Sequence, residues 1–236
     1  MELAVEWLGR IDYRTAWARQ HAMVAARAAG AIPDTVLLLE HPPVLTLGRQ
    51  ADPSFVRASQ ADLERRGIEL IRVERGGEVT YHGPGQLVVY PIVRLDERGI
   101  LLRSFVRALE AAMAETCLSY GVVAGRRDGQ PGCWVGPDGP APRKIGALGI
   151  RIERGVTYHG IALNVTTDLD AFALIDPCGL PDVVVTSIAA EAGWPDSSPT
   201  TASVRGAAQR FAPALADALT AGAALRPVPV PAPARV

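Results

Sequence analysis

Short apolar runs bounded by turn-forming residues occur throughout this chain and limit the folds open to it. Thr35 to Glu40, Val44 to Leu47 and Leu87 to Val93 are the clearest of them. Runs this short are typical of buried strands rather than of helices. Helical spacing of apolar residues occurs between them, most clearly from Leu101 to Tyr120. Since strands and helices do not alternate as strict βαβ units, we expect an α+β or mixed α/β fold, with a mixed, largely antiparallel sheet flanked by helices.

The same periodicities assign the individual elements. Strands are expected at 3–8, 35–40, 44–47, 68–73, 87–93, 145–152 and 156–165. Helices are expected from a cap at Asp12 to about residue 29, and at 62–66, 101–120 and 203–219. The glycine- and proline-rich stretch 125–142, interrupted at 132–136, indicates a loop, and segment 176–181 is not expected to form regular structure.

The chain of 236 residues is long enough for one domain with a sizeable core. We assign residues 1–222 to a single catalytic domain and the Pro- and Ala-rich residues 223–236 to an extended or disordered tail. A net charge of -1 provides no broad basic field for nucleic acid or an anionic membrane. No apolar run approaches a membrane span, and the acidic N-terminal region is unlike a secretory signal, so we expect a cytoplasmic protein. Three widely spaced cysteines predict neither a disulfide framework nor structural zinc.

Lys144 is the only lysine among the 24 Lys and Arg residues of the chain. Arginine is in effect always protonated, whereas a partly buried ammonium can shift its pKa and give up a proton. One retained lysine therefore suggests a task that a guanidinium cannot perform; the alternative is a surface lysine that survived by chance. The run that follows is bracketed by Gly146 and Gly149, as where a backbone approaches a ligand closely.

Cys178 is the best candidate for a nucleophile because it lies in a Pro-Cys-Gly turn. Such a turn exposes a side chain and leaves backbone N–H groups able to bind an oxyanion. A free cysteine is more often buried and inert, which is how we interpret Cys117 and Cys133. Since the thiolate is the reactive form, a nearby cation would activate Cys178, and Lys144 is a natural partner. Asp176 either orients Lys144 or caps the turn, and we favour the cap.

One stretch of the chain occurs twice in similar form. Residues 72–83 and 151–160 share an Arg-x-Glu-Arg-Gly start and a Thr-Tyr-His-Gly end. Each copy predicts a strand, a glycine turn and a second strand; if the two hairpins lie side by side, His82 and His159 would lie together. The alternative is a chance similarity in an Arg- and Gly-rich chain. A histidine after a tyrosine in a strand is more often a hydrogen-bonded core residue than a catalyst, so both interpretations of His82 stay open.

Three motifs occur in one order and spacing: Arg75 to Gln86, Arg143 to Gly149 continued by residues 159–165, and Asp176 to Gly179. Together they closely resemble the lipoyl(octanoyl) transferases, and the resemblance extends from about residue 3 to residue 190. The first block is highly specific, and so is the later Pro-Cys-Gly at its distance from Lys144. The proline-rich tail after Arg226 lies outside the family pattern.

The resemblance implies a fold like the catalytic domain of biotin and lipoate protein ligases. It implies that Cys178 accepts the acyl group and that Lys144 lowers the pKa of the thiol and handles protons. It further implies an acyl pocket lined by Arg75, Gly76, Gly77, Glu78, Val79, Thr80, Tyr81, His82, Ala147, Leu148, Gly149, Gly160, Ile161 and Ala162.

The implied reaction is a ping-pong transfer of octanoyl from acyl carrier protein, through a Cys178 thioester, to the ε-amine of a lysine. The implied acceptors are lipoyl domains of 2-oxoacid dehydrogenase complexes and the glycine cleavage H protein. We expect no metal, no cofactor beyond the carrier's phosphopantetheine, no nucleic-acid or membrane partner, and a monomer. The main rival is an ATP-dependent lipoate or biotin protein ligase of the same fold, whose acyl-adenylate chemistry needs no cysteine. A third interpretation is a catalytically dead module that binds acyl carrier protein.

Overall fold

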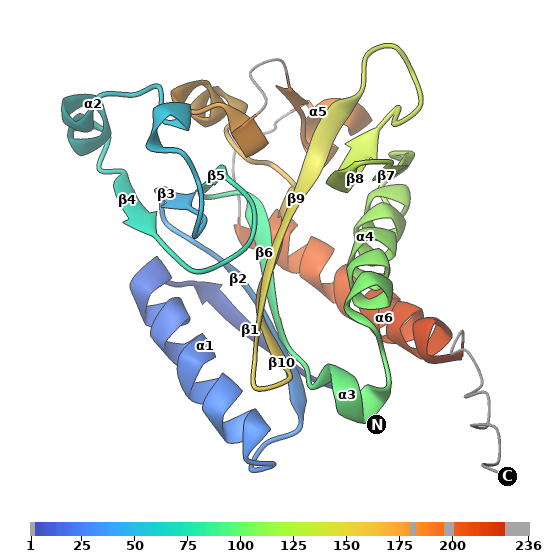
Figure 1. The fold of residues 1–236 in the computed structure, drawn as a ribbon. Coiled ribbons are helices and arrows are strands. Elements are labelled where there is room, and N and C mark those ends of the chain that lie inside the picture. Colours follow the sequence, from blue (N-terminus) through green and yellow to red (C-terminus); the bar gives the residue numbers. More distant parts are fainter. Residues whose placement is uncertain (1–2, 180–182, 196–200, 225–236) are drawn as a thin grey trace, which may run out of the picture.

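The computed structural model describes residues 3–179, 183–195 and 201–224, and within them the strands form two sheets (Figure 1). The larger sheet contains, in this order, β1 (Leu3–Arg10), β2 (Asp34–Glu40), β6 (Gln86–Ile92), β10 (Val156–Asn164), β9 (Arg143–Glu153), β8 (Gln130–Val135) and β7 (Ala124–Arg127), with β11 (Val184–Val185) also paired to β9. The smaller sheet contains β4 (Glu69–Arg72), β3 (Val44–Leu47) and β5 (Val79–His82), with β3 in the middle.

Both sheets are mixed. The pairs β1–β2, β9–β11 and β3–β4 are parallel, and the remaining described pairs are antiparallel. Strands β9 and β10 form a long hairpin that crosses the middle of the molecule (Figure 1). Beyond the end of β10, β11 takes its place beside β9 and pairs with Arg143 and Lys144. The expected mixed, largely antiparallel sheet flanked by helices is thereby confirmed.

Helices cover both faces of the larger sheet. They are α1 (Tyr13–Ala28), α2 (Gln60–Arg65), α3 (Leu95–Arg98), α4 (Leu102–Leu118), α5 (Ile188–Ala192) and α6 (Thr201–Ala224). Helix α1 begins as predicted, because the carboxylate of Asp12 accepts a hydrogen bond from the backbone N–H of Thr15 at 2.9 Å. It packs on β10 and β6, whereas α6 contacts β1, β2 and β6 and packs against α4 (Figure 1). Among the described residues, no helix combines the length and apolar character needed to cross a membrane.

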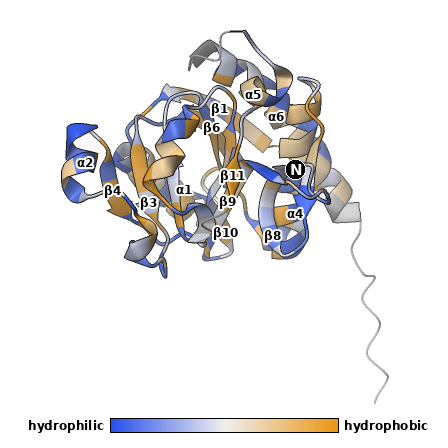
Figure 2. Ribbon diagram, turned by 90° about the horizontal axis from the view of Figure 1, so that it is seen from above, coloured by the Kyte–Doolittle hydropathy of each residue, from blue (hydrophilic) through white to orange (hydrophobic). Residues whose placement is uncertain are grey.

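Side chains alternate along the central strands, so each strand contributes to a hydrophobic cluster on each face of the sheet. On β2, Val36 and Leu38 belong to the large cluster that α4 and α6 cover, whereas Leu37 and Leu39 pack on the other side with Ala16 of α1. Every residue of β2 and β6 is buried, which is why both strands appear in the sequence as continuous apolar runs. Figure 2 shows apolar segments gathered on the inner strands and polar ones on α2 at the edge.

Several expectations need correction. The stretch 125–142 is not only a loop, because it contains most of β7 and all of β8, which form a hairpin at the sheet edge. Segment 176–181 includes one turn of 3₁₀ helix, η3 (Pro177–Gly179), which a proline with fixed φ can begin and Gly179 (φ +68°) can end. Helix α6 continues to Ala224, so residues 223 and 224 are helical, and the rest of the expected tail lies outside the described residues.

Candidate active site

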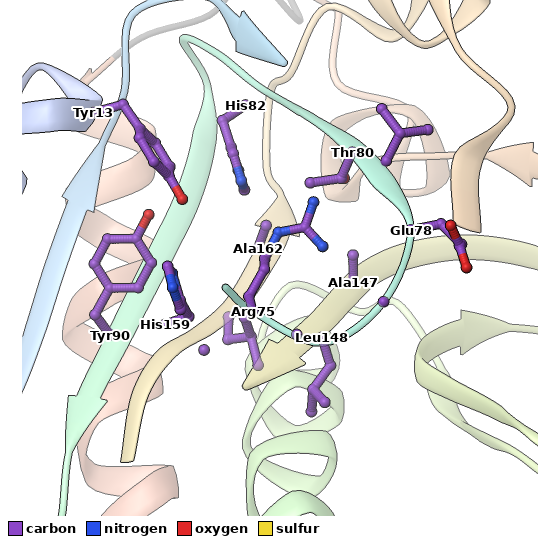
Figure 3. A pocket seen from close by; sticks show the side chains of 15 residues that line it. Tyr13, Arg75, Glu78, Thr80, His82, Tyr90, Ala147, Leu148, His159 and Ala162 are labelled. Carbon is purple, nitrogen blue, oxygen red and sulfur yellow. The ribbon is translucent and has the colours of Figure 1, made fainter. Parts of the chain in front are cut away.

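An apolar cavity lies between segment 75–82 and the β9–β10 hairpin (Figure 3). Its walls are formed by Tyr13, Arg75, Gly77, Glu78, Val79, Thr80, His82, Tyr90, Ala147, Leu148, Gly149, His159, Gly160, Ile161 and Ala162. The empty space among these residues is about 470 Å³, part of which is open to solvent. A narrow cavity lined mainly by small and apolar groups is shaped for a hydrocarbon chain.

The segment after β4 reaches the hairpin because glycines allow close approach of two backbones. The N–H of Gly76 donates to the carbonyl of Ile150 at 3.2 Å. A Cβ on Gly149 would lie 2.7 Å from the carbonyl oxygen of Gly76 and 3.2 Å from Cδ of Arg75. The backbone that approaches this glycine is the chain's own loop, and the close approach to a ligand that the sequence suggested stays a prediction.

Arg75 forms one wall of the cavity and is itself almost fully buried. Its guanidinium donates to the backbone carbonyl of Thr46 at 2.6 Å, to the hydroxyl of Thr46 at 2.8 Å and to the carbonyl of Gly76 at 3.0 Å. These bonds tie β3 to the glycine loop. The arginine therefore fixes the shape of the wall as well as lining it.

Lys144 is buried in a second hollow that adjoins the first. Its Nζ donates to the carbonyl of Pro131 at 3.1 Å and lies 5.0 Å from the ring centroid of Trp134, whose π face attracts a cation. Strand pairing fixes the backbone, since Lys144 lies opposite Trp134 of β8 on one side and Val185 of β11 on the other. The lone lysine is therefore held in one place by several elements and is not a surface residue retained by chance.

The two hollows adjoin each other. Thr80, Ala147 and Ala162 line both of them, and the second also contains Gln86, Gly146, Asn164 and Pro177. A wider surface hollow, lined by Glu78, Gln130, Pro131 and Leu148 among others, also reaches Lys144. Lys144 thus lines both the open surface hollow and the hollow that adjoins the apolar cavity.

The turn that carries Cys178 contributes to the same hollow as Lys144 through its neighbour Pro177. The side chain of Cys178 lies outside the described residues, so its pairing with Lys144 remains a prediction. The turn is closed by the N–H of Gly179, which donates to the carbonyl of Asp176 at 3.0 Å. The carboxylate of Asp176 forms an ion pair with Arg57, and its expected role as the cap of the turn stays a prediction.

The other two cysteines are packing residues, as predicted. Cys117 and Cys133 are fully buried and free. A hydrogen bond with Cys117, together with burial, raises the pKa of the Cys133 thiol well above its usual range. Neither thiol is suited to act as a nucleophile.

The two copies of the internal repeat do bring their histidines into one cavity, but by different structures. The second copy is the β9–β10 hairpin. The first copy is not a hairpin, because β4 and β5 do not pair with each other and each pairs with β3 instead. Two extra residues in the first copy form the loop that folds over the hairpin, and His82 and His159 both line the cavity.

All the residues predicted to line an acyl pocket border the first cavity except Gly76 and Tyr81. Gly76 lies beside it, in the wall of the surface hollow. Tyr81 points the other way along β5 and packs edge-on against Phe172, with ring centroids 5.6 Å apart. Their roles in binding a substrate remain predictions.

Comparison with known proteins shows the family of this chain. Residues 12–214 match the family described as the lipoyl protein ligase A/B catalytic domain. An octanoyltransferase of Chloroflexus aurantiacus is 49% identical over 192 residues, which are 81% of this chain and 85% of that protein. An octanoyltransferase of Mycolicibacterium gilvum is 45% identical over 222 residues, or 94% and 87% of the two chains. The chain belongs to the octanoyltransferase family.

Solved structures agree with this octanoyltransferase family assignment at the level of the fold. A putative lipoate protein ligase of T. acidophilum superposes with a TM-score of 0.64 at 16% identity and covers 95% of this chain and 93% of its own. Lipoate-protein ligase A bound with ATP gives 0.62 at 16% identity, with 94% and 92% covered. The expected likeness to the catalytic domain of lipoate ligases is confirmed.

Sequence reasoning missed three groups at this site of the octanoyltransferase chain. Tyr13 and Tyr90 line the cavity, and Trp134 lies against Lys144. An aromatic residue at the start of a helix or in a buried strand looks the same whether it packs in a core or lines a cavity, so no local pattern could have identified them. His159 did have such a pattern, because it occupies the same place in the repeat as His82.

Proposed function

We propose that this chain transfers an octanoyl group from acyl carrier protein to the ε-amine of a lysine on lipoyl domains. Its relatives at 45–49% identity are octanoyltransferases. The observation that carries the proposal is that the apolar cavity and the hollow around Lys144 and Pro177 share the lining residues Thr80, Ala147 and Ala162. An acyl chain can lie in the cavity while its carbonyl carbon lies beside the turn that holds Cys178.

The first half-reaction forms an acyl-enzyme. The Cys178 thiolate attacks the thioester carbonyl of the carrier-bound octanoyl group, and the C–S bond to phosphopantetheine breaks. The departing thiolate takes up a proton from the ammonium of Lys144, which is left as the neutral amine. Burial makes an ammonium at Lys144 an effective partner for a thiolate, because opposite charges attract more strongly there than in water.

The second half-reaction forms the amide. The acceptor lysine, as free amine, attacks the Cys178 thioester; an N–C bond forms, and Cys178 leaves as thiolate. The proton lost by the attacking nitrogen passes to the neutral amine of Lys144, which restores the ammonium beside the Cys178 thiolate. A guanidinium could support the first half-reaction by charge alone, but it could not accept this proton.

This chemistry also bears on the cofactors, the acceptors and the oligomeric state that we propose. A thioester is already activated toward an amine, so the transfer proceeds without ATP, metal or a bound cofactor. We propose lipoyl domains of 2-oxoacid dehydrogenase complexes and the glycine cleavage H protein as acceptors. A monomer is sufficient for this chemistry, since one chain supplies both Lys144 and Cys178, and we propose that the enzyme acts in the cytoplasm.

A transfer assay tests the proposal against its rivals. Purified protein is mixed with octanoyl acyl carrier protein and an unmodified lipoyl domain, with and without ATP. A third arm contains free octanoate and ATP in place of the carrier, and the lipoyl domain is weighed by mass spectrometry. Octanoylation at equal rates in the two carrier arms is the expected result. Modification that occurs only with free octanoate and ATP would identify a ligase, and the absence of modification in every arm would identify a non-catalytic binding module.

A further inference from the structure

Two tyrosines lie at the end of the apolar cavity away from Lys144. Tyr13 and Tyr90 line the cavity but are not among the residues that line the hollow around Lys144. That hollow adjoins the cavity at Ala147 and Ala162. Figure 3 shows the two tyrosines on one side of the cavity and Ala147 on the other. An acyl chain whose carbonyl lies beside the Lys144 hollow therefore has its last carbons near the tyrosines.

The hydroxyl of Tyr90 is held from behind the cavity wall. It lies 2.8 Å from Nε2 of His41, whose Nδ1 lies 2.8 Å from the carbonyl oxygen of Ile11. Because that carbonyl can only accept, Nδ1 carries the proton and Nε2 accepts from the tyrosine hydroxyl. The backbone of Tyr90 is paired with Leu37 of β2 in the central part of the larger sheet. Tyr90 is therefore fixed at both its backbone and its hydroxyl.

Tyr13 is the first residue of α1 and is held from several sides. The preceding residue, Asp12, caps the helix, which fixes the backbone at this point. The ring of Tyr13 lies 4.9 Å from the ring of His41 and is stacked on that of His82 with centroids 6.0 Å apart. Its hydroxyl faces the hydroxyl of Tyr90, with which it forms a side-chain hydrogen bond (Figure 3). The two tyrosines thus form one connected wall.

Two histidines complete this end of the cavity, and each is engaged with a protein group outside it. Nδ1 of His82 lies 2.7 Å from the side-chain oxygen of Gln86. The ring of His159 lies against the carboxylate of Glu74, with Nε2 3.8 Å from Oε1. The cavity consequently stays mainly apolar where these rings line it, so a saturated chain end can lie against them.

A wall held by this many contacts does not move aside easily for a longer chain, because protein interiors are close-packed. Tyr13 also packs in one cluster with the buried side chains of Val44, Ile71 and Val73. A shorter side chain in place of Tyr13 would leave a space bordered by these apolar groups. Such a space suits additional methylene groups of an acyl chain.

We propose that Tyr13, held against Tyr90, ends the acyl cavity and sets the longest acyl chain that the enzyme transfers efficiently. The inference rests on the proposed function, because it takes the cavity as the acyl site. It adds a specificity-determining residue to that function. Tyr13 lies on α1, outside the three sequence motifs that carry the family resemblance, and takes no part in the transfer chemistry.

A competition between acyl chains of different length tests this limit. Octanoyl and decanoyl acyl carrier proteins are mixed in equal amounts with a lipoyl domain, and the ratio of the two products gives the ratio of kcat/KM. We expect the wild-type enzyme to favour octanoyl. Tyr13→Leu should raise the decanoyl-to-octanoyl ratio by about tenfold or more, since a methylene group that an apolar pocket can or cannot accept changes discrimination by at least that order. Tyr13→Ala should extend the gain to dodecanoyl.

Two further variants separate chain length from other effects. Tyr13→Phe keeps the ring and removes only the hydroxyl, so the preference for octanoyl should remain. Tyr120→Leu makes the same exchange as Tyr13→Leu at a residue outside the cavity, where Tyr120 packs against Trp194 with ring centroids 5.5 Å apart, and should leave the ratio unchanged. A gain in decanoyl transfer cannot result from partial unfolding, which lowers the transfer of every chain. If Tyr13→Ala does not fold, Tyr13→Leu still decides.

The outcomes distinguish the length limit from the proposed function. An unchanged product ratio in a folded Tyr13→Leu protein that still transfers octanoyl would overturn the limit and leave the proposed function intact. A wild-type enzyme that transfers decanoyl as readily as octanoyl would do the same. Absence of octanoyl transfer by the wild-type enzyme would overturn the proposed function itself.

Discussion

At the scale of single residues, the structure shows how the one lysine of this chain is held. Lys144 is fixed by the carbonyl of Pro131 and the ring of Trp134 in the hollow that adjoins the apolar cavity. The sequence indicated that this lysine has a special task, because composition alone made it exceptional. It did not indicate Trp134, because the pairing of β8 with β9 that brings the two together is a long-range contact.

Exchange of the lysine for arginine tests that task. Lys144→Arg keeps the positive charge and, in this account, removes the ability to accept a proton from the acceptor amine. We expect octanoylation to fall by about 10²-fold or more, the usual contribution of a general base. Arg107→Lys, the reverse exchange at an exposed position, is the matched control and should keep full activity. Near wild-type rates for a folded Lys144→Arg protein would contradict the proton-transfer role.

Buried histidines should make the stability of the protein depend on pH. Burial lowers the pKa of His41 from its ordinary 6.5 to about 4. Between these two values the unfolded chain binds a proton that the folded chain does not, so stability decreases as pH falls through this window. For His41 alone, the loss between pH 7 and pH 5 is about 2 kcal/mol, and the lowered pKa values of His82 and His159 add to it.

Urea unfolding at pH 7 and pH 5 measures this effect. The free energy of unfolding should be lower at pH 5, and His41→Gln should reduce the difference between the two pH values. Equal stability of the wild-type protein at both values would show that these histidines are not kept neutral by burial.

At the scale of elements, the site depends on the contact between the loop before β5 and strand β9. The sequence predicted both strands of the β9–β10 hairpin. It assigned a hairpin to the first repeat copy as well, which is wrong because the two extra residues there let β5 pair with β3. It also missed the β7–β8 hairpin, whose glycines and prolines suggested a loop. Local propensity does not distinguish a short edge hairpin from a loop when tertiary pairing supplies its stability.

The loop contact can be tested with one methyl group. Gly149→Ala would place a Cβ 2.7 Å from the carbonyl of Gly76, so the loop must move away from β9. We expect a loss of about 1–3 kcal/mol in the free energy of unfolding and a strong loss of transfer activity, because the moved loop carries Arg75 and Gly77 of the cavity wall. Gly125→Ala, whose new Cβ would meet only Pro137 Cγ at 3.9 Å, is the control. Equal stability and activity of the two variants would refute the contact as a determinant of the site.

At the scale of the whole molecule, the cavity arises between the two sheets. One wall comes from the smaller sheet and the loop that leads into it, and the other from the central hairpin of the larger sheet. The motifs located most of the lining residues, but the arrangement of the strands could not be read from the sequence. The order β1-β2-β6-β10-β9-β8-β7 joins segments far apart in the chain. Tyr90 on β6 and Tyr13 at the start of α1 line the same cavity because this strand order brings their elements together.

The central claim is that octanoyl is held for a time as a thioester on Cys178. Its most direct test is the intact mass of the protein after brief mixing with octanoyl acyl carrier protein, without ATP and without acceptor. The account predicts a gain of one octanoyl group that peptide mapping places on Cys178, that Cys178→Ser loses under the same brief exposure, and that an added lipoyl domain removes. A protein that octanoylates the lipoyl domain at full rate with no such adduct, or with Cys178 replaced by alanine, would contradict it.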